Sequence, residues 1–179
     1  MENYSAALAL LNLFLPLVSF IILILFGKKI SASAHWIALT LIGSTLGIAV
    51  SFFVNVFVHN GEPILETSIR WFSTGSFSVN LGFLINNEAA IMLLVVALIS
   101  FLVHLYSVGY MQGDARYSRY FAYLGIFTFS MNGIVLADSL MMMYIFWELV
   151  GLSSYLLIGF WFEKDSAADA CKKAFLTNR

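Results

Sequence analysis

The sequence predicts an all-α membrane protein, a polytopic bundle of five transmembrane helices and the start of a sixth, with a small outer β-hairpin. Hydrophobic residues make up 61% of the 179 residues, charged residues make up 11%, and the mean hydropathy is +0.90. An ordinary soluble domain carries roughly 25% charged residues, and a soluble core of this size could not bury so much apolar surface. Five long apolar segments and a one-sided distribution of basic residues predict the same fold class.

A membrane-spanning helix requires about 20 predominantly apolar residues. Five segments meet that requirement, and helices are expected at residues 6–26, 36–58, 89–110, 120–137 and 139–162. The fourth and fifth helices are separated by little more than Asp138, which predicts a tight antiparallel pair. In the second helix, Gly43 and Gly47 form a GxxxG motif, which is typical of close helix packing.

The basic residues predict how the chain is oriented in the membrane. Eight of the nine Lys and Arg residues fall in loops or ends that five spans would place on one side: Lys28, Lys29, Arg116, Arg119, Lys164, Lys172, Lys173 and Arg179. Only Arg70 falls on the opposite side. Because basic residues gather on the inner side of membranes, the N-terminus is expected outside.

The segment between the second and third helices has the two-residue period of β-strands. Apolar residues at the odd positions of 77–83 alternate with polar or small ones, as in a half-buried strand. A similar alternation begins at Ile69 and leads to a turn candidate at residues 73–76. A β-hairpin is therefore expected at about 64–84, on the outer surface.

A sixth helix is expected to begin at Ser166, where Ser166 and Asp169 match the spacing of a capping box. Asp169 and Lys173 are then one turn apart and are expected to form an ion pair. The sequence stops at Arg179, only a few turns into this helix. We therefore expect the chain to be an N-terminal fragment of a longer protein.

Glu148 is the only charged residue in the fifth predicted span, about ten residues from either end. Ionisable groups at membrane depth are costly and usually belong to ion pathways or to a structural pair. The positions one turn away on its own helix carry no cation. Glu148 is therefore the main candidate for a functional role, in an ion pathway or in coupling. The alternative is a carboxylate that only fixes helix packing through hydrogen bonds.

Three other residues are candidates for a proton path. His104 lies within the third predicted span, and an imidazole exists in both protonation states near neutral pH. A hydrogen-bonded structural histidine is the alternative. Tyr144 lies one turn before Glu148, and Lys173 lies at the inner side, where it would serve either in the path or as a surface anchor.

The sequence gives no sign of a redox centre or a cofactor site. Cys171 is the only cysteine, which excludes an internal disulfide framework. No His/Cys cluster has metal-ligand spacing, and no glycine-rich nucleotide-binding motif is present. No metal, cofactor or nucleic acid is expected on this chain.

The second half of the chain resembles one family. The segments HLYSVGYM (104–111), RYFAYLGIFTFSM (119–131) and the residues from 136 to 179, which include WELVGLSSYLLIGFWFEK, are similar to the L-type, or chain-5-type, antiporter-like membrane subunit of proton-pumping NADH:quinone oxidoreductase (respiratory complex I). The similarity begins at the predicted hairpin. Where relatives commonly have Asp-Gly before the third helix, this chain has Asn86-Asn87 followed by Glu88, which puts the usual contact between hairpin and helix in doubt.

The resemblance implies a function. Glu148 matches the family's intramembrane glutamate, which in relatives pairs with a lysine on a later helix. Residues 1–179 would form the N-terminal part of one antiporter-like domain that couples quinone reduction elsewhere in the complex to proton movement. NADH, flavin, iron–sulfur clusters and quinone would be bound by other subunits. The implied partners are other membrane subunits of complex I, lipid and protons.

Two other hypotheses remain beside the complex I subunit. The second hypothesis is a large subunit of an Mrp-type sodium/proton antiporter or a relative from a membrane-bound hydrogenase, since these proteins share this fold and much of this motif. The third hypothesis is a membrane module whose carboxylate only orders helices. The expected location is the inner membrane of a bacterium, or alternatively of a mitochondrion.

Overall fold

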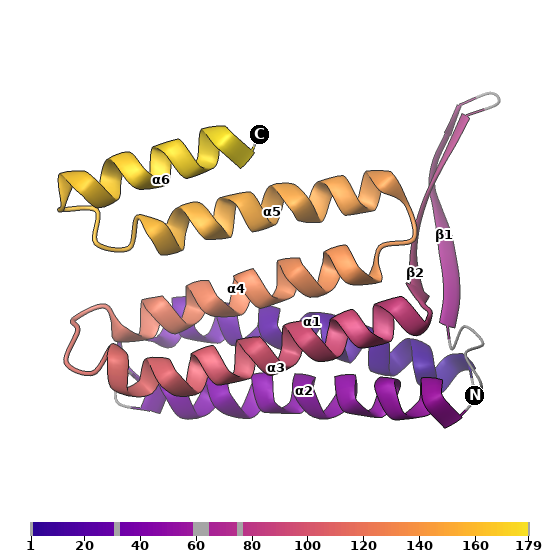
Figure 1. Ribbon diagram of the computed structural model, residues 1–179, viewed down its shortest axis with the longest axis horizontal. Helices are drawn as coiled ribbons and strands as arrows, with labels where there is room; N and C mark the ends of the chain where they lie inside the picture. The colour runs from indigo at the N-terminus through magenta and orange to yellow at the C-terminus, as the bar shows by residue number, and fades with distance from the viewer. Residues whose placement is uncertain (1, 31–32, 59–64, 75–76, 179) are drawn as a thin grey trace.

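A computed structural model describes residues 2–30, 33–58, 65–74 and 77–178 of the chain. Six helices and two strands follow one another along the chain: α1 (Glu2–Phe26), α2 (Ala34–Val58), β1 (Leu65–Thr74), β2 (Phe77–Ile85), α3 (Asn87–Tyr110), α4 (Tyr117–Leu136), α5 (Leu140–Ile158) and α6 (Asp165–Asn178). The helices run roughly side by side, and the hairpin stands at one end of the bundle (Figure 1). The predicted class, a helical membrane bundle with a small hairpin, is confirmed.

Within the described residues, four helices are long and apolar enough to cross a membrane, namely α1, α2, α3 and α5. Helix α4 was expected as a fifth span, and it forms a helix of 20 residues with a more polar composition. It contacts α1, α2, α3 and α5. Because these neighbours shield it from lipid, α4 can carry buried Thr128, Ser130 and Asn132.

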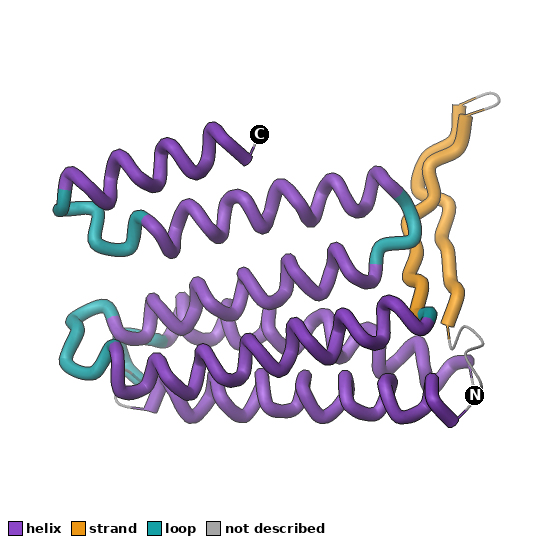
Figure 2. Tube along the Cα trace, viewed as in Figure 1, coloured by secondary structure: helices purple, strands orange, loops and turns teal. Residues whose placement is uncertain are grey.

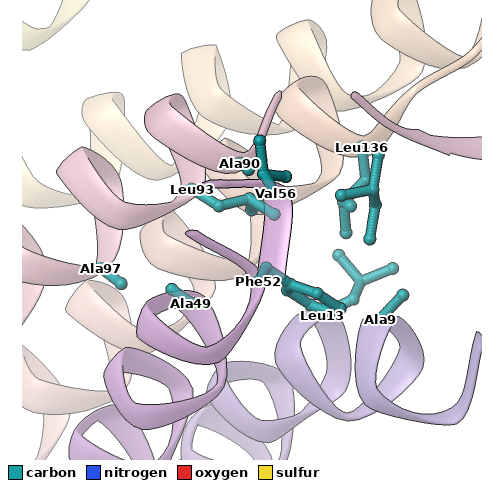
Figure 3. Close-up of a cluster of buried hydrophobic side chains, with 10 residues drawn as sticks. Ala9, Leu13, Ala49, Phe52, Val56, Ala90, Leu93, Ala97 and Leu136 are labelled. Carbon is teal, nitrogen blue, oxygen red and sulfur yellow. The ribbon is translucent and has the colours of Figure 1, made fainter. Parts of the chain in front are cut away.

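A large cluster of buried hydrophobic side chains lies near the hairpin end, where α1, α2, α3 and α4 meet (Figure 3). It combines bulky side chains with alanines that let the helices approach closely: Ala9, Leu13, Ala49, Phe52, Val56, Ile85, Ala90, Leu93, Ala97 and Leu136. The outer faces of the same helices expose large apolar side chains such as Phe14, Ile24, Val54 and Leu102. Apolar residues therefore face both inwards and outwards, as expected for helices in lipid.

Strands β1 and β2 pair in antiparallel fashion from Leu65 opposite Ile85 to Thr74 opposite Phe77, with one irregularity after Arg70. The predicted hairpin is confirmed, and residues 75–76 of the predicted turn lie outside the described residues. The base of β2 contacts the α4–α5 connection, where the Asp138 backbone N–H donates to the Gly82 carbonyl (3.2 Å). Asn86 caps α3 by accepting a hydrogen bond from the Ala89 N–H (2.8 Å), so this departure from the family pattern still supports a well-formed junction.

The α3–α4, α4–α5 and α5–α6 connections are short. The connections on the far side of the bundle from the hairpin lie together at one end (Figure 2). The α3–α4 and α5–α6 connections at this end, which we call the loop end, carry Arg116 and Lys164. At the hairpin end, Asp138 and Ser139 join α4 to α5, and Ser139 caps α5 by accepting from the Met142 N–H (3.3 Å). The predicted tight antiparallel pair is confirmed.

Three local predictions were wrong. Helix α5 ends at Ile158 rather than 162, because Gly159 caps it and the aromatic residues after it form a turn. Helix α6 begins at Asp165, so Ser166 lies inside the first turn and is not the N-cap. Asp169 pairs with Lys172 (3.5 Å) instead of Lys173.

Only one glycine of the α2 GxxxG motif lies at a helix–helix contact among the described residues. A Cβ atom on Gly43 would lie 3.4 Å from the Phe101 ring of α3, whereas one on Gly47 would meet nothing within 4 Å. Closer approaches that glycine permits occur on α4. There a Cβ on Gly125 would lie 3.0 Å from the Pro16 carbonyl of α1, and a Cβ on Gly133 would overlap the Phe146 ring of α5.

Candidate functional site

Glu148 lies near the middle of α5, and its side chain is half-buried. Phe146, two residues earlier, packs towards α4, with its ring centroid 5.5 Å from that of Phe129. Residues two apart on a helix point to different faces. Glu148 is therefore directed away from the α4 contact that Phe146 makes.

The face of α5 that carries Glu148 leads to α6. Three contacts follow this face at intervals of four residues. Gly159 lies against the Cys171 thiol, the Tyr155 and Phe175 rings are 5.6 Å apart, and Gly151 lies against the Asn178 side-chain amide. Glu148 lies one turn before Gly151 in the sequence, and so one turn farther from the loop end along the same face. The end of α6 lies opposite the middle of α5 (Figure 1).

The structure places the other sequence-predicted residues at different depths and faces. Tyr144 is one turn from Glu148 on α5 and is 60% exposed. Lys173 is exposed on α6, on a surface that it shares with Ala170, Ala174 and Thr177. Tyr144, Glu148 and Lys173 thus belong to the α5–α6 half of the molecule.

His104 lies in the other half. Its ring is fully buried between α3 and α4, with Nδ1 2.7 Å from the Ser100 carbonyl oxygen and the ring centroid 5.9 Å from that of Phe121. Nε2 has no hydrogen-bond partner among the described residues. Helix α4 contacts both α3 and α5 and lies between them in Figure 1, so the structure does not bring His104 to the Glu148 face.

A set of buried polar side chains on α4 was not identified from the sequence. Thr128 Oγ1 donates to Ser100 Oγ of α3 (3.1 Å), and Asn132 Nδ2 donates to the Asn12 carbonyl of α1 (3.2 Å). The Asn12 side chain in turn donates to the Thr45 carbonyl of α2 (3.0 Å). Asparagine within an apolar segment was the available signal, because a buried amide must find partners. These bonds tie α1, α2, α3 and α4 together.

The loop end is fastened by a second polar cluster, which we call the loop clasp: Asp114, Arg116, Trp161 and Glu163. Arg116 donates through both terminal nitrogens to Glu163 (2.9 and 3.0 Å), and the Trp161 indole donates to Asp114 (3.0 Å). The Arg116 guanidinium lowers the pKa of Glu163 through this hydrogen bond, and the Arg116 backbone N–H lowers the pKa of Asp114. The clasp joins the α3–α4 connection to the α5–α6 connection.

Over the described residues, no group of three or more His, Cys, Asp or Glu side chains is arranged to hold a metal ion. Away from the loop end, the polar groups described above include the Glu148 carboxylate of α5, the buried His104 imidazole, and hydrogen-bonding hydroxyl and amide groups. Such groups are able to bind, orient and exchange protons.

Two family models match the chain. The model described as "NADH-Ubiquinone oxidoreductase (complex I), chain 5 N-terminus" matches residues 71–121, and the model described as "NADH:quinone oxidoreductase/Mrp antiporter, TM" matches residues 137–179. The second match includes all of α5 and therefore Glu148.

Relatives support the same assignment. The chain is 48% identical over 136 residues to the chloroplastic NAD(P)H-quinone oxidoreductase subunit 5 of Chlorokybus atmophyticus, covering 75% of this chain and 21% of that protein. It is 51% identical over 119 residues to chain 5 of the Synechocystis enzyme, covering 66% of this chain and 18% of that protein. This chain thus spans about a fifth of the length of these relatives.

A solved structure has the same fold. The membrane-bound sulfane sulfur reductase, described as an archaeal respiratory membrane complex, contains a chain that matches with a TM-score of 0.77 at 21% identity, covering 94% of this chain and 33% of that chain. At this identity the likeness concerns the fold alone.

Proposed function

Because this chain belongs to the family of chain-5-type antiporter-like membrane subunits of NADH:quinone oxidoreductases, we propose that it carries protons across a membrane as part of such a complex. The reaction of the complex, oxidation of a nicotinamide cofactor by a quinone, would take place on other subunits. This chain would contribute the protonatable groups and the helix packing that positions them.

The observation that carries the proposal is the placement of Glu148. A carboxylate in the middle of an apolar helix is costly, and here it lies on the α5 face that meets α6 rather than at a loop. A proton taken up by Glu148 neutralises the carboxylate, and its release restores the charge. Such a change alters the electrostatic energy of any neighbouring cation, which is how proton movement would be coupled to a partner group.

Tyr144, Lys173 and His104 are proposed to extend the path. Tyr144 lies one turn from Glu148 and is able both to donate and to accept a hydrogen bond. Lys173 lies in the second half of α6, whose end lies opposite the middle of α5 (Figure 1). His104 would act separately, at the α3–α4 contact, where Nε2 is buried and would exchange a proton through water.

The proposed setting follows from the relatives and the charge pattern. The loop end, where Arg116 and Lys164 gather, would face the inner side of the membrane, and the N-terminus and the hairpin would lie outside. Other membrane subunits of the complex, lipid and protons are the proposed partners. A bacterial membrane is the proposed location. Among the relatives named above are a chloroplast protein and a cyanobacterial one.

Glu148→Gln in the assembled oxidoreductase tests the proposal. Glutamine keeps the size and hydrogen-bonding capacity of the side chain but cannot release a proton. We expect proton pumping by inverted membrane vesicles to fall by about a hundredfold, the lower range for a positioned proton-transfer group. Glu88→Gln is the matched control, because Glu88 is an exposed acid in the first turn of α3.

Assembly of the complex separates the proposed role from a structural one. Loss of pumping with normal assembly and a normal Glu88→Gln control supports the proposal. Normal pumping by Glu148→Gln would refute it, and loss of assembly would assign the carboxylate to helix packing.

A sodium/proton antiporter is the second candidate, because the family model that contains Glu148 describes both oxidoreductases and Mrp antiporters. The two functions differ in the ion moved. Uptake of ²²Na⁺ into vesicles, driven by a proton gradient and abolished by Glu148→Gln, would favour the antiporter. Acidification that does not depend on Na⁺ would favour the oxidoreductase subunit.

A further inference from the structure

A cavity of about 240 Å³ lies between α4, α5 and α6 at the loop end. Its wall combines basic and aromatic side chains, and it includes Arg119, Tyr123, Tyr155, Phe160, Phe162 and Lys172. The Arg116 guanidinium of the loop clasp lies 5.3 Å from the Phe160 ring and 5.1 Å from the Phe162 ring. The cavity is thus built from three helices and the turn that joins two of them.

The charged side chains that line this cavity, among the described residues, are all basic. Arg119 forms no ion pair with any residue that the structure describes. Lys172 has a single exposed pair with Asp169 (3.5 Å), and such pairs contribute little energy. None of the described residues that line the cavity is acidic. An anion entering the cavity would therefore meet two available cations, one from α4 and one from α6.

The residues around the cavity indicate which kind of anion would bind there. Tyr123 and Tyr155 have rings with one polar end, as is typical of residues at a membrane–water interface. Leu156 also lines the cavity, and the exposed Ile158 and Phe162 continue the apolar surface beside it. A small soluble anion would use only the basic side chains. A molecule with a phosphate at one end and hydrocarbon at the other would use both.

We propose that this cavity binds the headgroup of an anionic phospholipid. Arg119 and Lys172 hold the phosphate from opposite sides, since guanidinium and ammonium groups are the usual partners of phosphate. The Tyr123 and Tyr155 hydroxyls donate to the headgroup oxygens, and the acyl chains leave along Leu156 and Phe162. The bound lipid would connect α6 to α4. Helix α5 contacts both of these helices.

Lipid retention by the purified chain tests the proposal. The 179-residue chain is mixed in detergent with phosphatidylglycerol or phosphatidylcholine, and bound lipid is counted by native mass spectrometry. We expect preferential retention of phosphatidylglycerol, weakened about fivefold by Arg119→Gln and again by Lys172→Gln, because each basic residue near an anionic lipid contributes that much. Lys173→Gln is the matched control, because Lys173 neighbours Lys172 but does not line the cavity.

The outcomes distinguish a lipid from other ligands. Retention of phosphatidylglycerol that survives Arg119→Gln and Lys172→Gln, with helicity unchanged by circular dichroism, would overturn the proposal. So would equal retention of phosphatidylcholine, which would indicate a purely apolar cavity. Protection against thermal unfolding by inorganic phosphate alone, equal to that by phosphatidylglycerol, would identify a free phosphate as the ligand and would also overturn it.

Discussion

The side-chain amide of Asn132 on α4 donates a hydrogen bond of 3.2 Å to the backbone carbonyl of Asn12 on α1. In a regular helix this carbonyl would accept from the N–H of residue 16, but residue 16 is proline and has no N–H. Asn132 thus supplies the donor that Pro16 removes, across a contact where Gly125 also lets the two helices approach. Because lipid offers no replacement donor, this bond explains how α1 tolerates a proline in its middle.

Asn132→Ala is expected to lower the free energy of unfolding by about 1 kcal/mol, the size of an interhelical hydrogen bond in a membrane protein. Denaturation by SDS in mixed micelles measures the change. In a Pro16→Ala background, the backbone N–H restored at position 16 serves the Asn12 carbonyl, and Asn132→Ala should cost less. Ser130→Ala is the control, because Ser130 is buried on the same helix and, among the described residues, its hydroxyl donates only to the Ile126 carbonyl one turn away. An equal cost in both backgrounds would contradict the pairing.

Gly133→Ala is expected to destabilise the bundle, because the added methyl group would overlap the Phe146 ring in the α4–α5 contact. Overpacking of this kind costs about 1–3 kcal/mol, which exceeds the gain in helix propensity of about 1 kcal/mol. Gly47→Ala is the control, since its methyl group meets nothing within 4 Å. Thermal unfolding in detergent measures the effect. The Tm of Gly133→Ala should fall below that of the unsubstituted protein, whereas the Tm of Gly47→Ala should be unchanged or higher. The opposite order would show that α4 and α5 are packed differently.

The loop clasp is expected to loosen in acid. Folding lowers the pKa of Glu163 through its hydrogen bond from Arg116, and it lowers the pKa of Asp114 through the Arg116 backbone N–H. A carboxyl whose pKa is lowered on folding stabilises the folded state above its ordinary value of about 4 and loses that effect as pH falls through its folded value. Hydrogen exchange of the Trp161 indole N–H should therefore accelerate below about pH 4, beyond its intrinsic pH dependence.

Glu163→Gln gives the internal comparison for the clasp. Glutamine removes the ion pair with Arg116 but leaves the Trp161–Asp114 bond. The acceleration of indole exchange in acid should therefore become smaller, and it should depend on the protonation of Asp114 alone. Indole exchange that follows only its intrinsic pH dependence from neutral pH down to about pH 3 in the unsubstituted protein would contradict the assignment.

Gly159→Cys is expected to form a disulfide with Cys171, which is the only cysteine of the chain. A Cβ on residue 159 would lie 3.2 Å from the Cys171 Cβ, slightly closer than the 3.5–4.5 Å or so that is usual for disulfides. A shift of a few tenths of an ångström suffices. Oxidation followed by cleavage between α5 and α6 should leave the two fragments joined until a reductant is added. Ile158→Cys, at an exposed neighbouring position, should cross-link much less.

The sequence by itself determined the class of protein and the residue most worth testing. Composition and the length of the apolar segments sufficed for the helices, because lipid leaves a spanning chain little choice but a helix. The two-residue alternation sufficed for the hairpin. A carboxylate in an apolar helix made Glu148 conspicuous without any coordinates, since its cost follows from its surroundings along the chain.

Only the tertiary structure decided which surfaces meet. Apolar residues face both lipid and neighbouring helices, so periodicity could not show that α4 lies at the centre, that Gly47 packs against nothing described, or that α6 meets the Glu148 face of α5. Polar partners depend on approach from another helix, as Asn132 and Asn12 show across 120 positions of sequence. Local patterns fix which segments are helical in lipid, but contacts between helices come from the shapes and hydrogen bonds of residues far apart in the chain.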